Sequence, residues 1–324
     1  MTSLLWRAVN PERPMRLARL LLLMSAVVLL LPACTEQHAS SAGRGGNPAS
    51  NDPLSVYVVN YPLQYFAERI GGGHVRVTFP APADGDPAFW EPEVEQIAAY
   101  QEADLILLNG ASYAKWVQRV SLPASRMVDT SAAFSDRYIP LEGRTTHNHG
   151  AAGEHQHRDQ AFTTWLDPQQ AIEQAAAIRD ALIRLRPDAE AAFQQGFAAL
   201  QRDLQELDKH LAAAFARYKG QPLLFSHPVY QYLIRRYAID GYELHWEPDT
   251  MPGPEEWRAF DALLKRHPAG SMVWESTPTP EIVTALEQRG IEALVFDPAA
   301  NEPSAGDYLS VMRDNLARLS RESR

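Results

Sequence analysis

The chemistry that this sequence offers most clearly is metal binding by a cluster of histidines. Four of the ten histidines lie in the segment 145–158. They form two His-x-His pairs, His147 with His149 and His155 with His157. The segment is polar and contains glycine, so we expect an exposed loop. Paired imidazoles are good ligands for zinc, copper, nickel and iron, and Glu154 adds a carboxylate. The alternative is that these histidines only keep the loop soluble.

Hydrophobic patterning on both sides of this loop predicts alternating strands and helices. In the first half we expect strands at 55–59, 75–79 and 105–108, and helices at 64–70, at 93–102 and from 167 onward. In the second half we expect strands at 223–225, 242–244, 271–274 and 293–296, and helices at 229–237, 254–266, 280–289 and 307–319. Such alternation predicts an α/β fold with two lobes, each a mainly parallel sheet flanked by helices.

A single long helix is predicted between the two halves. Residues 188–218 contain no proline, and their large apolar side chains recur every three or four positions. The stripe consists of Phe193, Phe197, Leu200, Leu204, Leu207, Leu211 and Phe215. It predicts a rigid helix of roughly 30 residues, about 45 Å long. We therefore place the N-terminal lobe at 54–186, the linking helix at 187–219 and the C-terminal lobe at 220–324, with a ligand between the lobes at the carboxyl ends of the strands.

The N-terminal segment has the pattern of an export signal. Arginines precede an apolar run at 20–31, which at about 12 residues is too short to span a bilayer and fits a secretory signal peptide. The run ends at Leu31-Pro32-Ala33-Cys34, which resembles the lipobox of bacterial lipoproteins. We expect residues 1–33 to be removed, Cys34 to be lipidated, and residues 34–53 to form a flexible tether to the cell envelope. The alternative is an ordinary signal peptide followed by an incidental cysteine.

The composition and net charge of the chain limit the kinds of partner it can bind. With 45% hydrophobic and 22% charged residues, the 324-residue chain has the make-up of a globular protein. The formal net charge is −10, and it becomes −13 without the four arginines and one glutamate of residues 1–33. This charge argues against a nucleic-acid partner. We also find no nucleophile elbow, His-Glu-x-x-His motif or phosphate-binding loop, so we do not expect an enzyme.

Several motifs along the mature chain resemble one known family. They are Tyr61-Pro62-Leu63, Ile70-Gly71-Gly72, Ala103-Asp104-Leu105-Ile106, Asn109-Gly110, Trp165-Leu166-Asp167-Pro168, Ser226-His227-Pro228-Val229-Tyr230 and Phe296-Asp297-Pro298. From about residue 55 to 319 the chain is similar to the ZnuA-like receptors of zinc and manganese ABC importers. A histidine-rich loop just before the Trp-Leu-Asp-Pro motif is also typical of the zinc-importing members.

The resemblance implies a metal site between the lobes, but only half of it is present. His227 and Asp297 match two of the four positions that usually coordinate the metal. The other two positions differ: Ala88 stands where the N-terminal lobe normally offers a histidine, and Thr163 replaces the histidine two residues before the motif tryptophan. Neither alanine nor threonine is a useful zinc ligand.

Three alternatives could complete or replace this site. The loop histidines could reach it, because His157 lies six residues before Thr163, a span of up to about 20 Å when extended. Neighbouring residues of the C-terminal lobe could be recruited, namely Glu275, His245, Glu243 and Glu247. Finally, the cleft could bind a non-metal solute through Phe89, Trp90 and Trp246.

The function implied by the resemblance is capture of a divalent cation, zinc before manganese, for delivery to an ABC permease of the cytoplasmic membrane. We expect the metal as cargo, bound by a monomer on the extracytoplasmic face of the envelope. The alternatives are an envelope metal buffer or chaperone that acts through the histidine-rich loop, and a receptor for a non-metal solute.

Overall fold

The computed structural model describes residues 52–83, 85–141 and 160–320, which belong to one compact unit. The predicted signal peptide, Cys34, the tether to residue 51 and the histidine-rich loop lie outside the described residues. In the described part, no helix combines the length and the apolar character needed to cross a membrane.

The N-terminal lobe contains a parallel sheet of four strands in the order β2-β1-β3-β4. The strands are β1 Leu54–Val58, β2 Val75–Thr78, β3 Leu105–Leu108 and β4 Met127–Asp129. Strand β3 is almost entirely buried, as expected for a parallel strand covered on both faces. The helices of this lobe are α1 Tyr61–Gly71, α2 Val94–Glu102 and α3 Pro168–Leu185.

Polar caps fix where two of these helices begin. The side chain of Asn60 accepts a hydrogen bond from the backbone N–H of Leu63, and that of Asp167 accepts one from Gln169. Both helices carry proline in the first turn, where its missing N–H costs nothing. The Tyr-Pro-Leu and Trp-Leu-Asp-Pro motifs are therefore helix starts.

The C-terminal lobe repeats the arrangement with the strand order β6-β5-β7-β8, again all parallel. Its strands are β5 Leu223–Phe225, β6 Gly241–Glu243, β7 Ser271–Trp274 and β8 Glu292–Val295. Its helices are α5 Gln231–Tyr237, α6 Pro254–Leu264, α7 Pro280–Glu287 and α8 Tyr308–Leu319.

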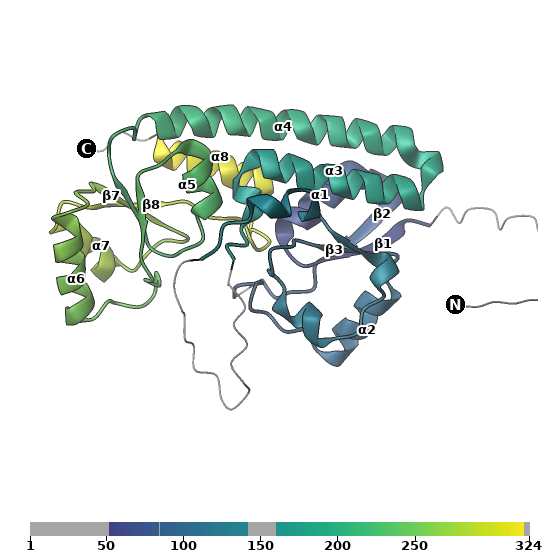
Figure 1. Ribbon diagram of the computed structural model, residues 1–324, viewed down its shortest axis with the longest axis horizontal. Coiled ribbons are helices and arrows are strands. Elements are labelled where there is room, and N and C mark those ends of the chain that lie inside the picture. Colours follow the sequence, from purple (N-terminus) through teal and green to yellow (C-terminus); the bar gives the residue numbers. More distant parts are fainter. Residues whose placement is uncertain (1–51, 84, 142–159, 321–324) are drawn as a thin grey trace, which may run out of the picture. The chain divides into compact units, whose positions relative to one another are not determined.

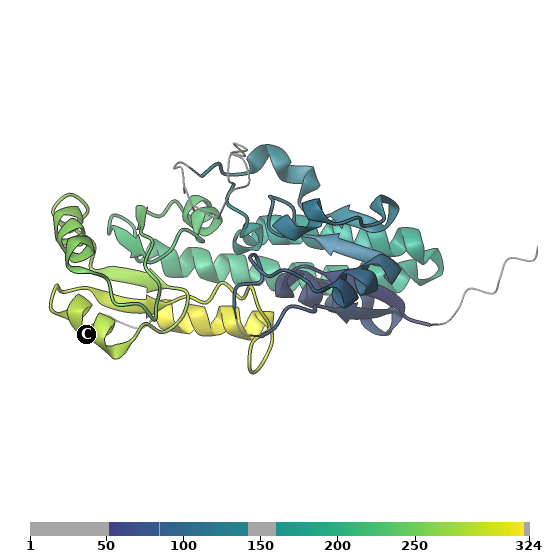
Figure 2. The same ribbon diagram turned by 90° about the horizontal axis from the view of Figure 1, so that it is seen from below.

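Helix α4, Glu190–Ala216, runs along both lobes (Figures 1 and 2). It packs against α1 and α3 in the N-terminal lobe and against α5 and α8 in the C-terminal lobe. All seven residues of its apolar stripe are buried. One hydrophobic core extends from Val56 of β1 through this stripe to Phe225 of β5, while a second core lies within the C-terminal lobe around Trp257 and Phe260. The lobes therefore share most of their interior.

The two-lobe α/β fold is confirmed, with small corrections at element ends. The long helix is 27 residues and starts at Glu190, because a 3-10 turn at Pro187–Ala189 precedes it. The helix expected from residue 229 starts at Gln231, since the N–H of Val229 bonds to the carbonyl of His227 instead. Strand β4 was not predicted, because its three residues are too few to show an alternating pattern.

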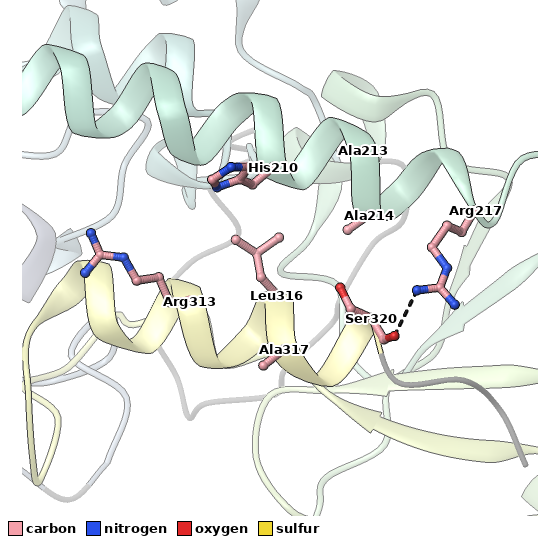
Figure 3. Close-up of a pocket in the computed structure, with 8 residues that line it drawn as sticks. All are labelled: His210, Ala213, Ala214, Arg217, Arg313, Leu316, Ala317 and Ser320. Carbon is pink, nitrogen blue, oxygen red and sulfur yellow. Dashed lines mark hydrogen bonds between the residues drawn. The ribbon is translucent and has the colours of Figure 1, made fainter.

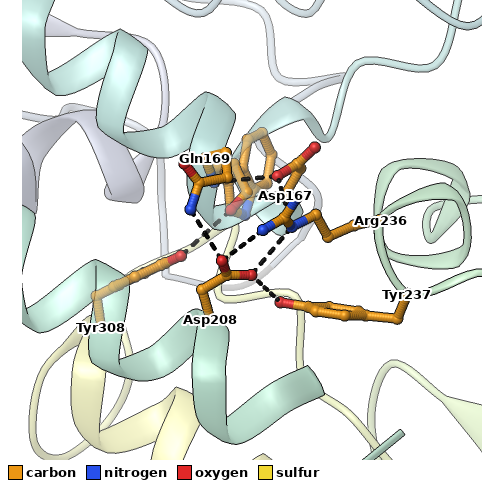
Figure 4. Close-up of polar contacts among 7 residues, drawn as sticks. Asp167, Gln169, Asp208, Arg236, Tyr237 and Tyr308 are labelled. Carbon is orange, nitrogen blue, oxygen red and sulfur yellow. Dashed lines mark hydrogen bonds and ion pairs between the residues drawn. The ribbon is translucent and has the colours of Figure 1, made fainter. Parts of the chain in front are cut away.

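A polar cluster ties both lobes to α4 (Figure 4). Arg236 of α5 bonds Asp208 of α4 at 2.5 Å and approaches Asp167, the cap of α3, at 3.7 Å. Gln169 and Tyr237 also donate hydrogen bonds to Asp208. A buried carboxylate of α4 is thus satisfied by residues from both lobes.

Candidate metal centre

The carboxyl ends of the two sheets face each other. Just after β3, the Asn109 amide bonds the carbonyl of Phe162, and the next residue, Thr163, donates its hydroxyl to the carbonyl of Val229 beyond β5. Just after β1, the backbone N–H of Tyr61 bonds the carbonyl of Ala300 beyond β8. This junction is where open α/β sheets bind ligands.

His227 is the centre of the polar residues on the C-terminal side of the junction. It follows β5, and Glu275 follows the neighbouring strand β7. Nδ1 of His227 lies 3.1 Å from Oε1 of Glu275, and Nε2 lies 3.8 Å from Oε1 of Glu247. Nδ1 is buried, and its separation from Glu275 is that of a close ion pair. The ring of His245 is edge-on to that of His227, with 6.1 Å between centroids.

The electrostatic surroundings of His227 favour a positive charge. Burial lowers its pKa, but the carboxylates of Glu275, Glu247 and Asp86 raise it by more, so that the net shift is upward. A cation at this position would experience the same attraction.

Asp297 belongs to the same sheet edge, after β8. Its backbone is held by the side chain of Asn315, which accepts from the N–H and donates to the carbonyl of Asp297. Its Oδ1 accepts the N–H of Ala299. Burial raises the pKa of Asp297, and the nearby charge of Glu275 raises it further. The backbone around Asp297 is thus held in place by Asn315, and its side chain by its own turn.

Asp86 is a residue that the sequence reasoning missed. It lies in the N-terminal lobe two residues before Ala88, and its Oδ1 accepts the N–H of Ala88. Asp86 is an exposed residue, and partial loss of water around its carboxylate is the largest cause of its raised pKa. Glu275 and Glu247 raise that pKa and His227 lowers it, so Asp86 lies within electrostatic reach of the group around His227.

The two residues that differ from the pattern implied by the resemblance, at positions 88 and 163, are both buried. Ala88 is 4% exposed and Thr163 is 3% exposed. The Thr163 hydroxyl donates a hydrogen bond to the carbonyl of Val229, which is two residues beyond His227. At position 163 there is a hydrogen bond between the lobes, where the resemblance implies a metal ligand.

The predicted ligands are only partly assembled. His227 and Glu275 are in contact, Asp297 follows the strand next to that of Glu275, and the four loop histidines lie outside the described residues. Nowhere in residues 52–83, 85–141 and 160–320 do three or more His, Cys, Asp or Glu side chains converge closely enough to hold a metal ion. The three aromatic residues considered for a non-metal solute do not contact one another, because each ring packs on a different partner. Phe89 contacts Phe162, Trp90 contacts Trp116, and Trp246 contacts Trp257 and Phe260 in the second core.

A separate pocket of about 440 Å³ lies between α4 and α8 (Figure 3). It is lined by His210, Ala213, Ala214, Arg217, Arg313, Leu316, Ala317 and Ser320. Arg217 donates to the carbonyl of Ser320. The charged residues here are basic, so this pocket is unsuited to a cation.

The polar junction and the fold can be compared with known proteins. A family model described as ZnuA, zinc-uptake complex component A periplasmic, matches residues 56–322. The chain belongs to this family. The high-affinity zinc uptake system protein ZnuA of Bacillus subtilis (strain 168) is 23% identical over 316 residues, covering 92% of this chain and 95% of that protein. The manganese ABC transporter substrate-binding lipoprotein PsaA of Streptococcus pneumoniae is 25% identical over 321 residues, covering 94% and 98%.

Solved structures share the fold of this ZnuA family member. The Zn(II)-bound ZnuA-like domain of Streptococcus pneumoniae AdcA superposes with a TM-score of 0.70 at 21% identity, covering 82% of this chain and 97% of that chain. The metal-dependent lipoprotein YcdH of Bacillus subtilis gives a TM-score of 0.71 at 20% identity, with the same coverage. The resemblance inferred from the sequence motifs is therefore confirmed.

Proposed function

We propose that this protein is the solute-binding subunit of a metal-ion ABC importer and captures one divalent cation, zinc or manganese, at the junction of its lobes. The observation that carries the proposal is the contact of His227 with Glu275 at the carboxyl ends of β5 and β7, with Glu247 3.8 Å from the ring and Asp297 following the neighbouring strand β8. Membership of the ZnuA family and the zinc and manganese named for its relatives support this cargo.

The group around His227 suits reversible capture. Imidazole and carboxylate are ligands for both cations, and carboxylates are the better match for manganese.

The test is calorimetric titration of zinc and manganese into purified protein and its variants. To silence the loop, all four of its histidines are first replaced by serine in the full chain. In this background we expect one site per chain, weakened about tenfold or more by His227→Ala or by Glu275→Gln. The matched control is His210→Ala, which removes an exposed histidine of α4 and should leave the affinity unchanged. Unchanged binding in both site variants would exclude this site.

The histidine-rich loop supports a second candidate function, an envelope metal buffer. A buffer that works through the loop should bind several equivalents weakly, and it should lose them when the four histidines are replaced. A receptor should keep one tight site in the same variant. The loop histidines could also contribute to the site itself, in which case the tight site would weaken without disappearing.

We also propose that the chain is exported, acylated at Cys34 and attached to the envelope, where it meets an ABC permease. The apolar run and the lipobox-like Leu31-Pro32-Ala33-Cys34 support this location, as do relatives that are named lipoproteins. Metabolic labelling with a radioactive fatty acid should mark the wild type and fail to mark Cys34→Ser. No enzymatic step is required for this role.

A further inference from the structure

We propose that Asp86 is the cation ligand supplied by the N-terminal lobe, in place of the imidazole that is absent at position 88. This inference rests on the proposed function, because it names a further residue of the same site. It assigns a carboxylate oxygen to the side of the cation that faces the N-terminal lobe.

The backbone before Asp86 is fastened to the C-terminal lobe. Nδ2 of Asn301 donates to the carbonyls of Pro82, Ala83 and Gly85, at distances of 2.8 to 3.2 Å. Asn301 lies four residues after Asp297, in the loop that leaves the sheet edge at β8. The segment that carries Asp86 is therefore anchored to the same loop that carries a predicted ligand.

The Asp86 side chain is oriented by its own turn. Its Oδ1 accepts the N–H of Ala88 at 2.8 Å, and its carbonyl accepts the N–H of Phe89 at 3.1 Å. In the described part of the chain, Oδ2 forms no hydrogen bond. The turn buries Ala88 and leaves one carboxylate oxygen of Asp86 without a hydrogen bond among the described residues. In this lobe the residue able to donate an electron pair to a cation is therefore Asp86, two residues before position 88.

The anchored segment lies at the junction, and charge interactions with the residues around His227 support a role for this carboxylate there. The charges that act on Asp86 are those of Glu275, His227 and Glu247, and both glutamates lie within ion-pair distance of His227. Of the charges that act on His227, Asp86 supplies the one from the N-terminal lobe. Three carboxylates facing one imidazole repel each other, and a divalent cation between them removes that repulsion.

The neighbouring acidic residue on the same segment does not compete for this role. Glu91 forms an ion pair with Arg119 at 2.5 Å, and both side chains are largely exposed. It therefore offers a matched control that removes one negative charge from the same segment.

The experiment compares Asp86→Asn with Glu91→Gln in the background with the loop histidines replaced by serine. Asparagine retains the oxygen that accepts the N–H of Ala88, so the turn should persist. Titration with Mn²⁺ and with Zn²⁺ should show at least about tenfold weaker binding for Asp86→Asn and less than twofold change for Glu91→Gln. Melting curves without metal should coincide for all three proteins.

The outcomes separate this inference from the proposed function. If His227→Ala weakens binding and Asp86→Asn matches the wild type, the site stands and Asp86 is not a ligand. If neither variant changes binding, the site itself is wrong. If Glu91→Gln weakens binding as much as Asp86→Asn, the effect is a general loss of negative charge and the ligand assignment is overturned.

Discussion

The imidazole ring of His227 lies between two carboxylates, which affect both its protonation and its ability to bind a cation. Glu275 and Glu247 attract a proton to the ring, whereas coordination of a cation requires the ring to be neutral. The proton and the cation thus compete for the same nitrogen atoms. The outcome of this competition depends on the carboxylates around the ring as much as on the ring itself.

Cation affinity should therefore fall in acid. An unperturbed histidine has a pKa of about 6.5, and the surrounding carboxylates raise the pKa of His227, so competition begins at higher pH. Below that pKa a single essential imidazole lowers the apparent affinity by about tenfold per pH unit. We expect clearly weaker zinc binding at pH 5.5 than at pH 7.5 in calorimetric titrations. Equal affinities at the two values would contradict ligation by His227.

The nature of the residue at position 86 should tune the choice of metal. An imidazole suits zinc better than manganese, whereas a carboxylate serves both. We expect Asp86→His to raise the zinc-to-manganese affinity ratio by about tenfold relative to the wild type. Competition titrations with a metal-sensitive dye measure this ratio directly. A ratio that stays constant would mean that residue 86 does not touch the cation.

The sequence could predict the C-terminal half of this site but not the N-terminal half. His227, Glu275 and Asp297 each follow a strand of one sheet, and parallel strands bring their carboxyl ends to one edge. Asp86 follows no strand, and its position depends on three hydrogen bonds from Asn301, more than 200 residues away in the sequence. No local pattern reports such a contact.

At the scale of elements, α4 approaches α1 unusually closely at one residue. A Cβ atom added to Gly196 would lie 2.6 Å from the carbonyl oxygen of Ile70 and 2.7 Å from that of Arg69. Both oxygens belong to the backbone of α1 and cannot rotate away. The glycine is thus required by the crossing of two helices, although its backbone is helical.

Gly196→Ala should destabilise the protein, against helix propensity. Alanine normally stabilises a helix interior by about 1 kcal/mol relative to glycine. Here the clash should reverse the sign and reduce the free energy of unfolding by about 1–3 kcal/mol. The control is Gln195→Ala at the adjacent exposed position, which should change stability by less than about 0.5 kcal/mol. Urea denaturation of both variants gives the comparison.

Element types followed from the sequence more readily than their ends. The apolar stripe from Phe193 to Phe215 has strict helical spacing, so the long helix was evident. Its first residue depends on the 3-10 turn at Pro187–Ala189, and the start of α5 depends on a bond between Val229 and His227. These are local backbone choices that hydrophobic spacing does not encode.

For the whole molecule, the cluster around Asp208 joins the parts into one body. Arg236→Met should lower the free energy of unfolding by about 1–3 kcal/mol, because it leaves the Asp208 carboxylate with only neutral donors. The double variant with Asp208→Asn should cost less than the sum of the two single changes. Chemical denaturation of all four proteins measures the coupling, and strict additivity would show that the pair contributes nothing.

The same pair gives a pH dependence of known sign. Burial raises the pKa of Asp208. Hydrogen bonds from Arg236, Gln169 and Tyr237 together lower it by more, so the net shift of the pKa is downward. The ionised carboxylate therefore stabilises the fold above its unfolded pKa of about 3.9, and this contribution disappears as the pH falls through the lower folded value. The stability difference between the wild type and Arg236→Met should shrink below about pH 4. A difference that grows in acid would contradict this assignment.

The larger hydrophobic core continues through α4 from one lobe to the other, and this continuity allows cation binding to be measured by thermal unfolding. The larger of the two cores is shared by both lobes, so heating should produce a single cooperative transition. A cation held at the junction then protects every part of the body to the same degree. The melting temperature becomes a gauge of occupancy, readable with a fluorescent dye and without any label on the metal.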